Sequence, residues 1–423
     1  MAPRFAGFSW LVGLLAGLGA CGNPSNDVLS GGVTGAATGG TTGGNAAAGG
    51  SAGAGQGHGQ GGGGNGSGGG VGGASGGSDM AGAGAVGGGG AGSVGGSGGA
   101  AMVGVFVAQG HEGRITRSCD DGLTFPYNHS ADDQFRCFVD ADHDCDHSEL
   151  AGRGLAFGEG AFVATWGWGH PGKLQRSVNG QAWSDVMTET PTFADVAYGN
   201  GTFVACGNPT RVSHDGQAWE EGGKLSFDFN YRGIEFVPTA GGLFVVGGES
   251  GANRAISYSA DGKAWQAASD RPDLCGEQLR GIAGSDSAMI LVSAKGHVCR
   301  STDGKTWTFA QVTERFTSPP LWTGDEFWVY SGAQLYKSAD AMTWTSQAIT
   351  PANIQIGALA RSPGGTLVAA NDGWQVWYEK QQFFRSTDGV SWSVLPPGSF
   401  TGSHPINFIS FGYVPASAGC GAP

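Results

Sequence analysis

From about residue 101 onward, short runs of apolar residues alternate with polar turn residues along the chain. Paired runs such as "GLAFGEGAFVATW" and "GIAGSDSAMILVSA" recur ahead of a repeated polar motif. Runs of about 4 to 8 residues that are rich in β-branched and aromatic side chains, and that end in Gly, Asn or Asp, predict β-strands. Each unit therefore predicts strand, turn, strand, loop, strand, Asp-containing turn and strand.

The repeated motif is Ser-x-Asp-x-x-x-Trp, clearest in "STDGKTW" and "STDGVSW", with looser copies that have Asn for Asp or Phe for Trp. Seven copies begin at Ser118, Ser177, Ser213, Ser259, Ser301, Ser338 and Ser386. In such a turn the Asp oxygen accepts backbone N–H bonds, Gly supplies positive φ, and Ser adds a local bond. The spacing averages about 45 residues, which suits one four-stranded propeller blade.

The two ends of the repeat region complete each other. The segment "MVGVFVAQG" begins as a second strand without a first, and "PINFISFGYVP" is a first strand without followers. Residues 406 to 415 are expected to pair beside 103 to 108, which leaves no open sheet edge. The sequence thus predicts an all-β, seven-bladed β-propeller with four-stranded antiparallel blades, closed by pairing of its N- and C-terminal strands.

The repeat resembles the Asp-box (BNR, sialidase-like) repeat of sialidases, sortilin-type receptors and several bacterial propellers, over roughly Val103 to Pro415. The resemblance implies that each box lies between the third and fourth strands of a blade, on the face opposite the ligand site. The boxes are therefore expected to be structural. The chain departs from sialidases in having seven boxes rather than six blades, no Arg-Ile-Pro element near its start, and no identifiable Tyr-Glu nucleophile pair.

Residues 1–20 predict an export signal, because one basic residue, Arg4, precedes an apolar run that is too short for a stop-transfer helix. The run ends in Leu18-Gly19-Ala20-Cys21, which resembles the bacterial lipobox. The mature protein is then expected to begin at a lipidated Cys21, and an ordinary cleaved signal is the alternative. Since Gly22 stands where an inner-membrane retention signal has Asp, we expect an outer-membrane or cell-surface lipoprotein, with the periplasmic face also open.

Residues 21–100 are expected to be a lipidated N-terminus followed by a disordered linker, because a segment of mainly Gly, Ala, Ser and Thr cannot bury enough apolar surface to fold. A flexible chain of this length reaches about 45 Å from the membrane. The propeller domain is expected to span 101–423. The formal charge of −13 argues against nucleic acid as a partner, because nucleic-acid-binding proteins concentrate Lys and Arg.

An insertion, "NHSADDQFRCFVDADHDCDHSEL", carries alternating carboxylates in the first blade. The candidate ligands are Asp140, Asp142, Asp144, Asp146 and Glu149. Several hard oxygens on one turn suit Ca²⁺. The EF-hand pattern is not met, because its glycine position holds Cys145 and its twelfth position holds Ala151. A zinc site through His143 and His147, or a solvated acidic loop, are the alternatives.

Two further loops, "WGWGHPGK" and "DGWQVWYEKQQ", are expected on the same face as the insertion. Their aromatic rings could stack on sugar faces, since such rings combine a large apolar surface with a polar handle. The candidates are Trp166, Trp168, Trp374, Trp377 and Tyr378. Packing between blades is the alternative for about half of them.

Three inner strands begin alike, with "RGLAFG", "RGIEF" and "RGIAG", and place Arg153, Arg232 and Arg280 at one repeat position in blades two, four and five. Guanidinium groups that converge on the channel could bind a carboxylate or sulfate. The departures from sialidases favour the alternative, which is structural pairing with loop carboxylates. The same position holds Asn407, Ala194, Pro319 and Gln355 in the other blades.

Of eight cysteines, seven remain once Cys21 is lipidated, so at least one stays unpaired in an oxidising compartment. The expected pairs are Cys137 with Cys145, Cys275 with Cys299, and Cys119 with Cys420. Cys206, in the apolar run "TFVACG", is then the spare and is expected to be buried.

These features favour a binding module for an extracellular glycan or protein. A glycosidase is the first rival, and it would need two carboxyls flanking a pocket, for which Asp195 and Glu235 are the candidates. An assembly or scaffolding factor is the second rival, because fold does not determine function.

Overall fold

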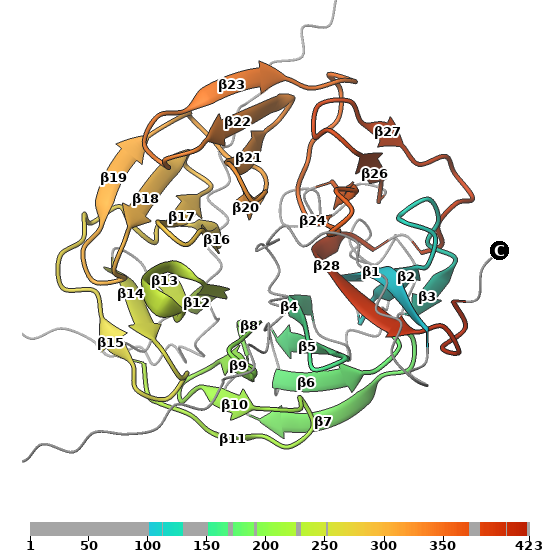
Figure 1. The fold of residues 1–423 in the computed structure, drawn as a ribbon, viewed down its shortest axis with the longest axis horizontal. Coiled ribbons are helices and arrows are strands. Elements are labelled where there is room, and N and C mark those ends of the chain that lie inside the picture. The colour runs from blue at the N-terminus through green and yellow to red at the C-terminus, as the bar shows by residue number, and fades with distance from the viewer. Residues whose placement is uncertain are drawn as a thin grey trace, which may run out of the picture. The chain divides into compact units, whose positions relative to one another are not determined.

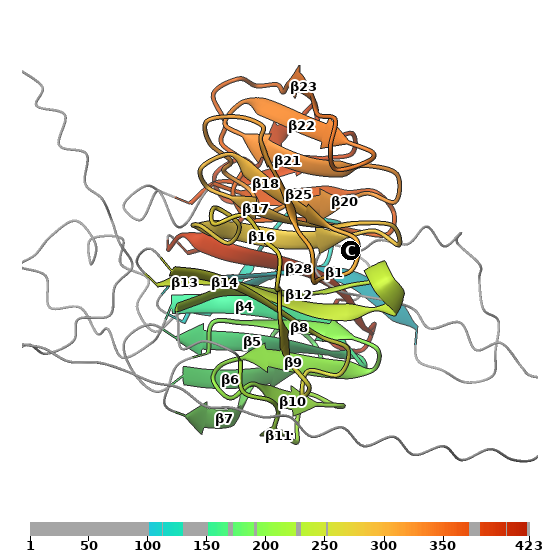
Figure 2. The same ribbon diagram turned by 90° about the vertical axis from the view of Figure 1, so that its left-hand side faces the viewer.

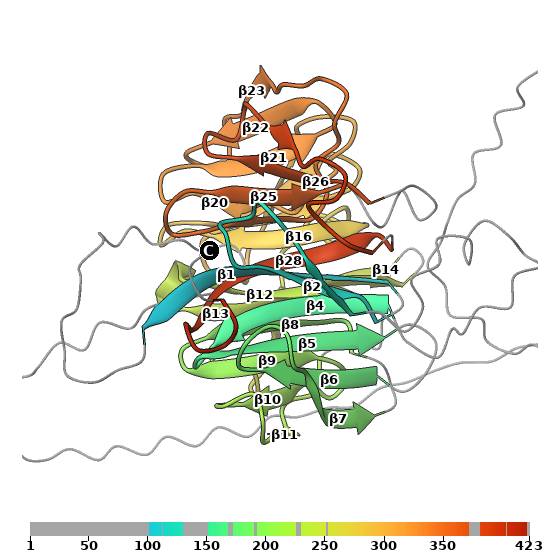
Figure 3. The same cartoon turned by 90° about the vertical axis from the view of Figure 1, so that its right-hand side faces the viewer.

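The protein is a ring of seven four-stranded antiparallel sheets around a central axis (Figure 1). The computed structural model describes residues 101–423 except 112, 130–150, 168–171, 190–192, 226–229, 251–252, 372–380, 403 and 421–423. Figures 2 and 3 show this ring edge-on. The predicted seven-bladed β-propeller is confirmed. Within the described ranges, no helix is both long and apolar enough to cross a membrane.

Each blade runs from an inner strand beside the axis to an outer strand at the rim. The inner strands are β28 (Ile406–Pro415), β4 (Ala151–Gly158), β8 (Asp195–Gly199), β12 (Asn230–Val237), β16 (Leu279–Gly284), β20 (Leu321–Trp322) and β24 (Leu359–Arg361). The second strands are β1 (Met102–Gly110), β5 (Ala161–Gly167), β9 (Thr202–Cys206), β13 (Leu243–Ser250), β17 (Met289–Ser293), β21 (Phe327–Ser331) and β25 (Leu367–Ala370).

The third strands end at the serine of each repeat. They are β2 (Ile115–Ser118), β6 (Gly172–Ser177), β10 (Arg211–Ser213), β14 (Asn253–Ser259), β18 (His297–Ser301), β22 (Gln334–Ser338) and β26 (Phe383–Ser386). The outer strands are β3 (Tyr127–His129), β7 (Ser184–Glu189), β11 (Glu220–Glu221), β15 (Gln266–Ala267), β19 (Thr308–Gln311), β23 (Thr345–Ala348) and β27 (Ser393–Val394). A short 3₁₀ turn, η2 (Thr239–Gly241), precedes β13.

The core lies between the blades, because both faces of every sheet pack on a neighbour. One large apolar residue of each second strand pairs with the serine of its repeat, and all seven are almost completely buried. They are Phe106, Phe162, Phe203, Phe244, Met289, Phe327 and Leu367. The repeat therefore fixes a layer of the core as well as a turn.

The seven Ser–Asp turns, defined as the repeats that begin at these serines, all connect a third strand to a fourth, as expected. In the fifth turn, Asp303 Oδ1 accepts the N–H groups of Lys305 and Thr306 at 2.9 and 2.8 Å. The Ser301 hydroxyl donates to the same oxygen, and the Trp307 indole N–H donates to the carbonyl of the turn glycine. The Thr306 N–H is the main cause that holds the pKa of Asp303 below its usual value.

Replacing Asp303 by Ala is expected to lower the free energy of unfolding by about 1 kcal/mol, because two turn N–H groups lose their acceptor. The loss is limited because the carboxylate and both N–H donors are exposed, so water replaces the bond. Asp303→Asn is the matched control. Its amide oxygen is expected to keep the turn, as Asn179 does in the second repeat, where it accepts two N–H groups at 2.8 Å. Urea unfolding measures both variants, and equal losses would contradict the acceptor role.

An arginine directly before the serine links four of these turns to the next blade. Its guanidinium donates to a main-chain carbonyl in the following turn, which is a strong bond because the donor is charged. The pairs are Arg117 with Asn179, Arg176 with Asp215, Arg300 with Asp340, and Arg385 with Asp121. The last pair spans the junction between the seventh and first blades.

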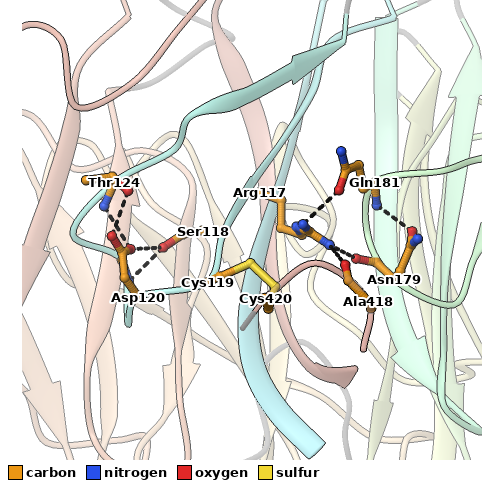
Figure 4. The surroundings of a disulfide bond; sticks show 10 residues. Arg117, Ser118, Cys119, Asp120, Thr124, Asn179, Gln181, Ala418 and Cys420 are labelled. Atoms are coloured by element: carbon orange, nitrogen blue, oxygen red, sulfur yellow. Dashed lines mark hydrogen bonds between the residues drawn. A yellow bond between two sulfur atoms is a disulfide. The ribbon is translucent and has the colours of Figure 1, made fainter. Parts of the chain in front are cut away.

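The ring is closed by the chain ends, as predicted. β28 pairs antiparallel with β1 from Met102↔Pro415 to Gly110↔Ile406. The disulfide Cys119–Cys420 joins the first Ser–Asp turn to the segment after β28. Figure 4 shows Arg117 beside it, donating to the carbonyl of Ala418 at 3.2 Å.

Candidate functional site

The inner strands begin on the face opposite the Ser–Asp turns, because strand direction alternates within each blade. The loops that join the second strand of a blade to the third, and the fourth strand to the inner strand of the next blade, lie on this same face. We call it the channel face. β4, β8, β12 and β16 stand side by side around the axis there (Figure 1). The residues at their starting ends are therefore the natural candidates for a ligand site.

Each of the three predicted arginines is the extra residue of a β-bulge. On β4, Gly152 pairs with Trp166 and Gly154 with Thr165, so Arg153 has no partner across the strand pair. The register shifts in the same way around Arg232 on β12 and around Arg280 on β16. Bulges redirect side chains and are frequent at functional sites. We call this ring of positions the bulge level.

A fourth bulge lies at the same level on β28. There Ile406 pairs with Gly110 and Phe408 with Gln109, which leaves Asn407 as the extra residue. The Asn407 amide donates to the carbonyl of Gly152 at 3.1 Å and so fixes β28 against the start of β4. Its alignment with the arginines was visible in the sequence, but the bulge was not.

Glycine follows each arginine, and in two of the three pairs a neighbouring segment comes too close for a side chain; at Gly233 an added Cβ would come no closer than 3.3 Å, to the Asp195 Oδ2. A Cβ added to Gly154 would overlap the Asp195 carboxylate and lie 2.7 Å from the Asp195 Cα. One added to Gly281 would lie 2.9 Å from the Pro319 Cβ. In blades two and five the bulge thus places the arginine, and the glycine allows the neighbouring segment to approach.

The structure describes the side chains of Arg153 and Arg280, but not that of Arg232. Arg153 and Arg280 are half-buried, and both already interact with other parts of the protein. For Arg232 the structure describes only the backbone, within β12. The structure therefore places the three residues at one level of adjacent or near-adjacent inner strands, as the sequence alignment predicted.

Asp195 replaces the glycine of the Arg-Gly pair in the third blade. Its Oδ2 accepts the N–H of Ile234 on β12 at 3.1 Å, and its Oδ1 accepts the N–H of Val196 at 2.8 Å. The residue keeps some solvent contact, yet protein encloses the carboxyl. This burial raises the pKa of Asp195 to about 7, and the positive charge of Arg153 acts in the opposite direction.

Glu235 on β12 lies close enough to Asp195 for their charges to interact. It is 9% exposed, and its Oε1 accepts the N–H of Phe236 at 3.2 Å. Burial raises the pKa of Glu235 well above its usual value, and the charge of Asp195 adds to the effect. The two carboxyls that the sequence suggested only weakly thus form one buried acidic pair.

The predicted cysteine pairs are confirmed within the described residues. The structure contains Cys119–Cys420 and Cys275–Cys299, and Cys206 is free and buried. Burial raises the pKa of the Cys206 thiol, so the thiol stays neutral and unreactive. The pair Cys137 with Cys145 lies outside the described residues.

The expectation that Trp166 is exposed for ligand stacking is wrong. Trp166 is 2% exposed and packs in the cluster that contains Val105 and Phe157. It lies on β5, where both faces of the sheet are covered by neighbouring blades. The other aromatic candidates, Trp168, Trp374, Trp377 and Tyr378, lie outside the described residues.

The acidic insertion also lies outside the described residues, with all five candidate metal ligands. They are Asp140, Asp142, Asp144, Asp146 and Glu149. Among the residues that are described, no group of three or more His, Cys, Asp or Glu side chains could hold a metal ion.

A polar cluster at the channel face of blades four and five was not predicted. Glu277 accepts a bond from Arg254 at 3.0 Å and lies 3.7 Å from the His297 Nδ1. The next residue, Gln278, has a φ of 41°, and its N–H donates to Glu249 at 3.0 Å. No repeat relates these residues to other blades, so alignment of the repeats could not find them.

Comparison by sequence gives no match, either to a protein-family model or to a curated protein. Among solved structures, a protein from Lactobacillus plantarum has 11% identity and a TM-score of 0.52, over 74% of this chain and 99% of that one. YCF48 bound to a D1 peptide has 17% identity and a TM-score of 0.46, over 63% and 85%. Virginiamycin B lyase from Staphylococcus aureus has 14% identity and a TM-score of 0.47, over 63% and 97%. At 11% identity, the likeness to the Lactobacillus plantarum protein shows the fold alone.

Proposed function

We propose that the protein is an exported, lipid-anchored Asp-box propeller that binds an anionic group of an extracellular glycan or protein at its channel face. The observation that carries this proposal is the repeated Arg-Gly bulge, which puts Arg153, Arg232 and Arg280 at one level of the inner strands. Guanidinium groups bind carboxylates and sulfates through paired hydrogen bonds. The chain as a whole has a formal charge of −13, so three arginines at one level form a local concentration of positive charge.

The binding test is an array of acidic and neutral glycans and peptides, probed with the unlipidated Cys21→Ser chain. We expect acidic members to bind, and the double variant Arg153→Gln/Arg280→Gln to lose about tenfold or more in affinity. Lys305→Gln is the matched control, because Lys305 is an exposed cation on the opposite face. Equal binding of acidic and neutral members, or equal loss in the control, would contradict the proposal.

The anchor in this proposal is Cys21. Replacing Cys21 by Ser is expected to release the protein from the membrane fraction completely, because acyl chains supply the membrane affinity. The melting temperature is expected to stay unchanged, since the Gly-rich linker separates Cys21 from the propeller. Fractionation, palmitate labelling and thermal unfolding measure these effects. Undiminished labelling of the variant would refute the anchor.

A second candidate is a carbohydrate-active enzyme, and the buried pair Asp195 and Glu235 favours it. Two neighbouring carboxyls whose pKa values are raised by burial resemble the acid and base of a glycosidase. Chromogenic glycosides test this function directly. Turnover that disappears in Glu235→Gln would favour the enzyme over the binding module.

The acidic insertion is proposed to bind Ca²⁺ weakly, because it offers many carboxylates without the glycine that shapes an EF-hand loop. We expect heat on calorimetric titration with millimolar Ca²⁺, and its loss in the variant Asp142→Asn/Asp144→Asn. The same heat in parent and variant would favour a solvated acidic loop.

A further inference from the structure

We infer that Asp195 is a built-in counter-ion of the bulge level, so that the channel face binds an anion together with a proton and binds it more tightly as the pH falls. This inference rests on the proposed anion site. It adds to that site a residue that regulates the affinity, and it adds the uptake of a proton when the anion binds.

Asp195 is a charged residue at a repeat position that holds glycine in three other blades. It stands where Gly154, Gly233 and Gly281 stand in blades two, four and five, one residue after the bulge position. Only the third blade therefore carries a charge at this place. That blade also lacks the arginine, because Ala194 occupies the bulge position.

The Asp195 carboxylate contacts both neighbouring inner strands. Its Oδ1 lies against Gly154 of β4, directly after Arg153, and its Oδ2 accepts the N–H of Ile234 on β12. The group thus lies between the two strands that carry Arg153 and Arg232. The N–H groups of Ile234 and Val196 bond to different oxygens of Asp195. In the protonated carboxyl, the carbonyl oxygen keeps one of these bonds and the hydroxyl oxygen can still accept the other, more weakly, so loss of the charge need not move the group.

The charge of Asp195 affects how strongly the arginines attract an anion. When ionised, Asp195 offsets the positive charge of Arg153 and repels an incoming anion. When protonated, it leaves the arginine charge available to the ligand. Burial brings the pKa of Asp195 to about 7, so this change takes place within the range of ordinary environments.

The other groups around Asp195 do not replace it in this role. Glu235 interacts with it from β12, and burial raises the pKa of Glu235 well above its usual value, which favours the neutral form of this second carboxyl. The Cys206 thiol, which faces it from β9, is neutral because its pKa is raised. Arg153 on β4 stays charged. The structure describes no side chain for Arg232.

The experiment is a titration of the unlipidated full chain with inorganic sulfate, whose charge is constant between pH 5.5 and 8.5. We expect the affinity to rise about tenfold from pH 8.5 to pH 5.5, which corresponds to a pKa shift of about one unit on binding. Calorimetry in buffers of different ionisation enthalpy is expected to show uptake of about 0.5 proton near pH 7.5. Sulfated oligosaccharides and peptides with acidic termini, titrated in the same way, distinguish the two sources of the anion.

Two variants remove the titrating group. Asp195→Asn is expected to bind at pH 8.5 about as tightly as the parent does at pH 5.5, with no proton uptake. Asp195→Gly restores the residue of blades two, four and five and gives the same test if the amide variant does not fold. Asp215→Asn, in a Ser–Asp turn on the opposite face, is the matched control and is expected to keep the parent pH dependence.

The outcomes separate this inference from the proposed function. If sulfate binds and Arg153→Gln weakens it, but no proton is taken up or the Asp195 variants keep the pH dependence, the inference is wrong and the anion site stands. If sulfate and the acidic ligands bind at no pH, or Arg153→Gln has no effect, the proposed site itself is wrong.

Discussion

Removing the disulfide that closes the ring is expected to lower the free energy of unfolding by about 3 to 5 kcal/mol. Cys119 and Cys420 are separated by 301 residues, so their bond constrains nearly the whole unfolded propeller. Cys275 and Cys299 are separated by only 24 residues and provide a matched comparison. In the chain-entropy model, the longer loop is worth about 2 kcal/mol more.

The measurement is urea unfolding of Cys119→Ser/Cys420→Ser beside Cys275→Ser/Cys299→Ser. Both variants keep the β1–β28 ladder, so the difference reports the cross-link rather than the strand pairing. A larger loss for the short loop would show that residual structure in the unfolded chain, and not loop length, controls the effect.

Replacing Gly154 by Ala is expected to lower the free energy of unfolding by about 3 kcal/mol, even though only one methyl group is added. The new Cβ would overlap the Asp195 carboxylate and lie 2.7 Å from backbone atoms of Asp195 and Val196. Because the obstacle is backbone rather than a movable side chain, β4 and β8 must separate. The same shift would move Arg153, so anion binding is expected to fall as well.

Gly364→Ala is the control for this substitution. Only the Ser362 hydroxyl comes within 4 Å of a Cβ at that position, at 3.7 Å, so the stability is expected to change by about 0.5 kcal/mol or less. Thermal and urea unfolding measure both variants. A loss at Gly154 no larger than that at Gly364 would mean that the inner strands are less tightly packed than the structure shows.

Repetition explains why so much of the fold could be predicted from the sequence. Seven Ser–Asp turns fix where the third strand of each blade ends, and the apolar partner of each serine fixes the second strand. The role of β28 followed from the unmatched strands at the chain ends. The two described disulfides followed from cysteine positions in the same blade map.

The site was predicted less completely because its geometry depends on contacts between blades. The alignment found Arg153 and Arg280, but a bulge is a shift of register that no single residue type specifies. Trp166 has the composition of a ligand-binding aromatic and is nevertheless core, because the adjacent blade covers it. The interaction of Asp195 with Glu235 requires β8 and β12 to approach closely, and that approach is visible only in the structure, for example where Phe236 of β12 packs on Gly199 of β8.

The innermost strand of the first blade, β28, is the last strand in the described part of the chain. β28 ends at Pro415, whereas its partner β1 begins at Met102, so a nascent chain already contains six complete blades and three strands of the first blade before the ring can close. A chain cut short before β28 leaves β1 with an unpaired edge, and unpaired edges recruit strands from other molecules. A chain that lacks β28 is therefore expected to aggregate instead of forming a slightly smaller working protein.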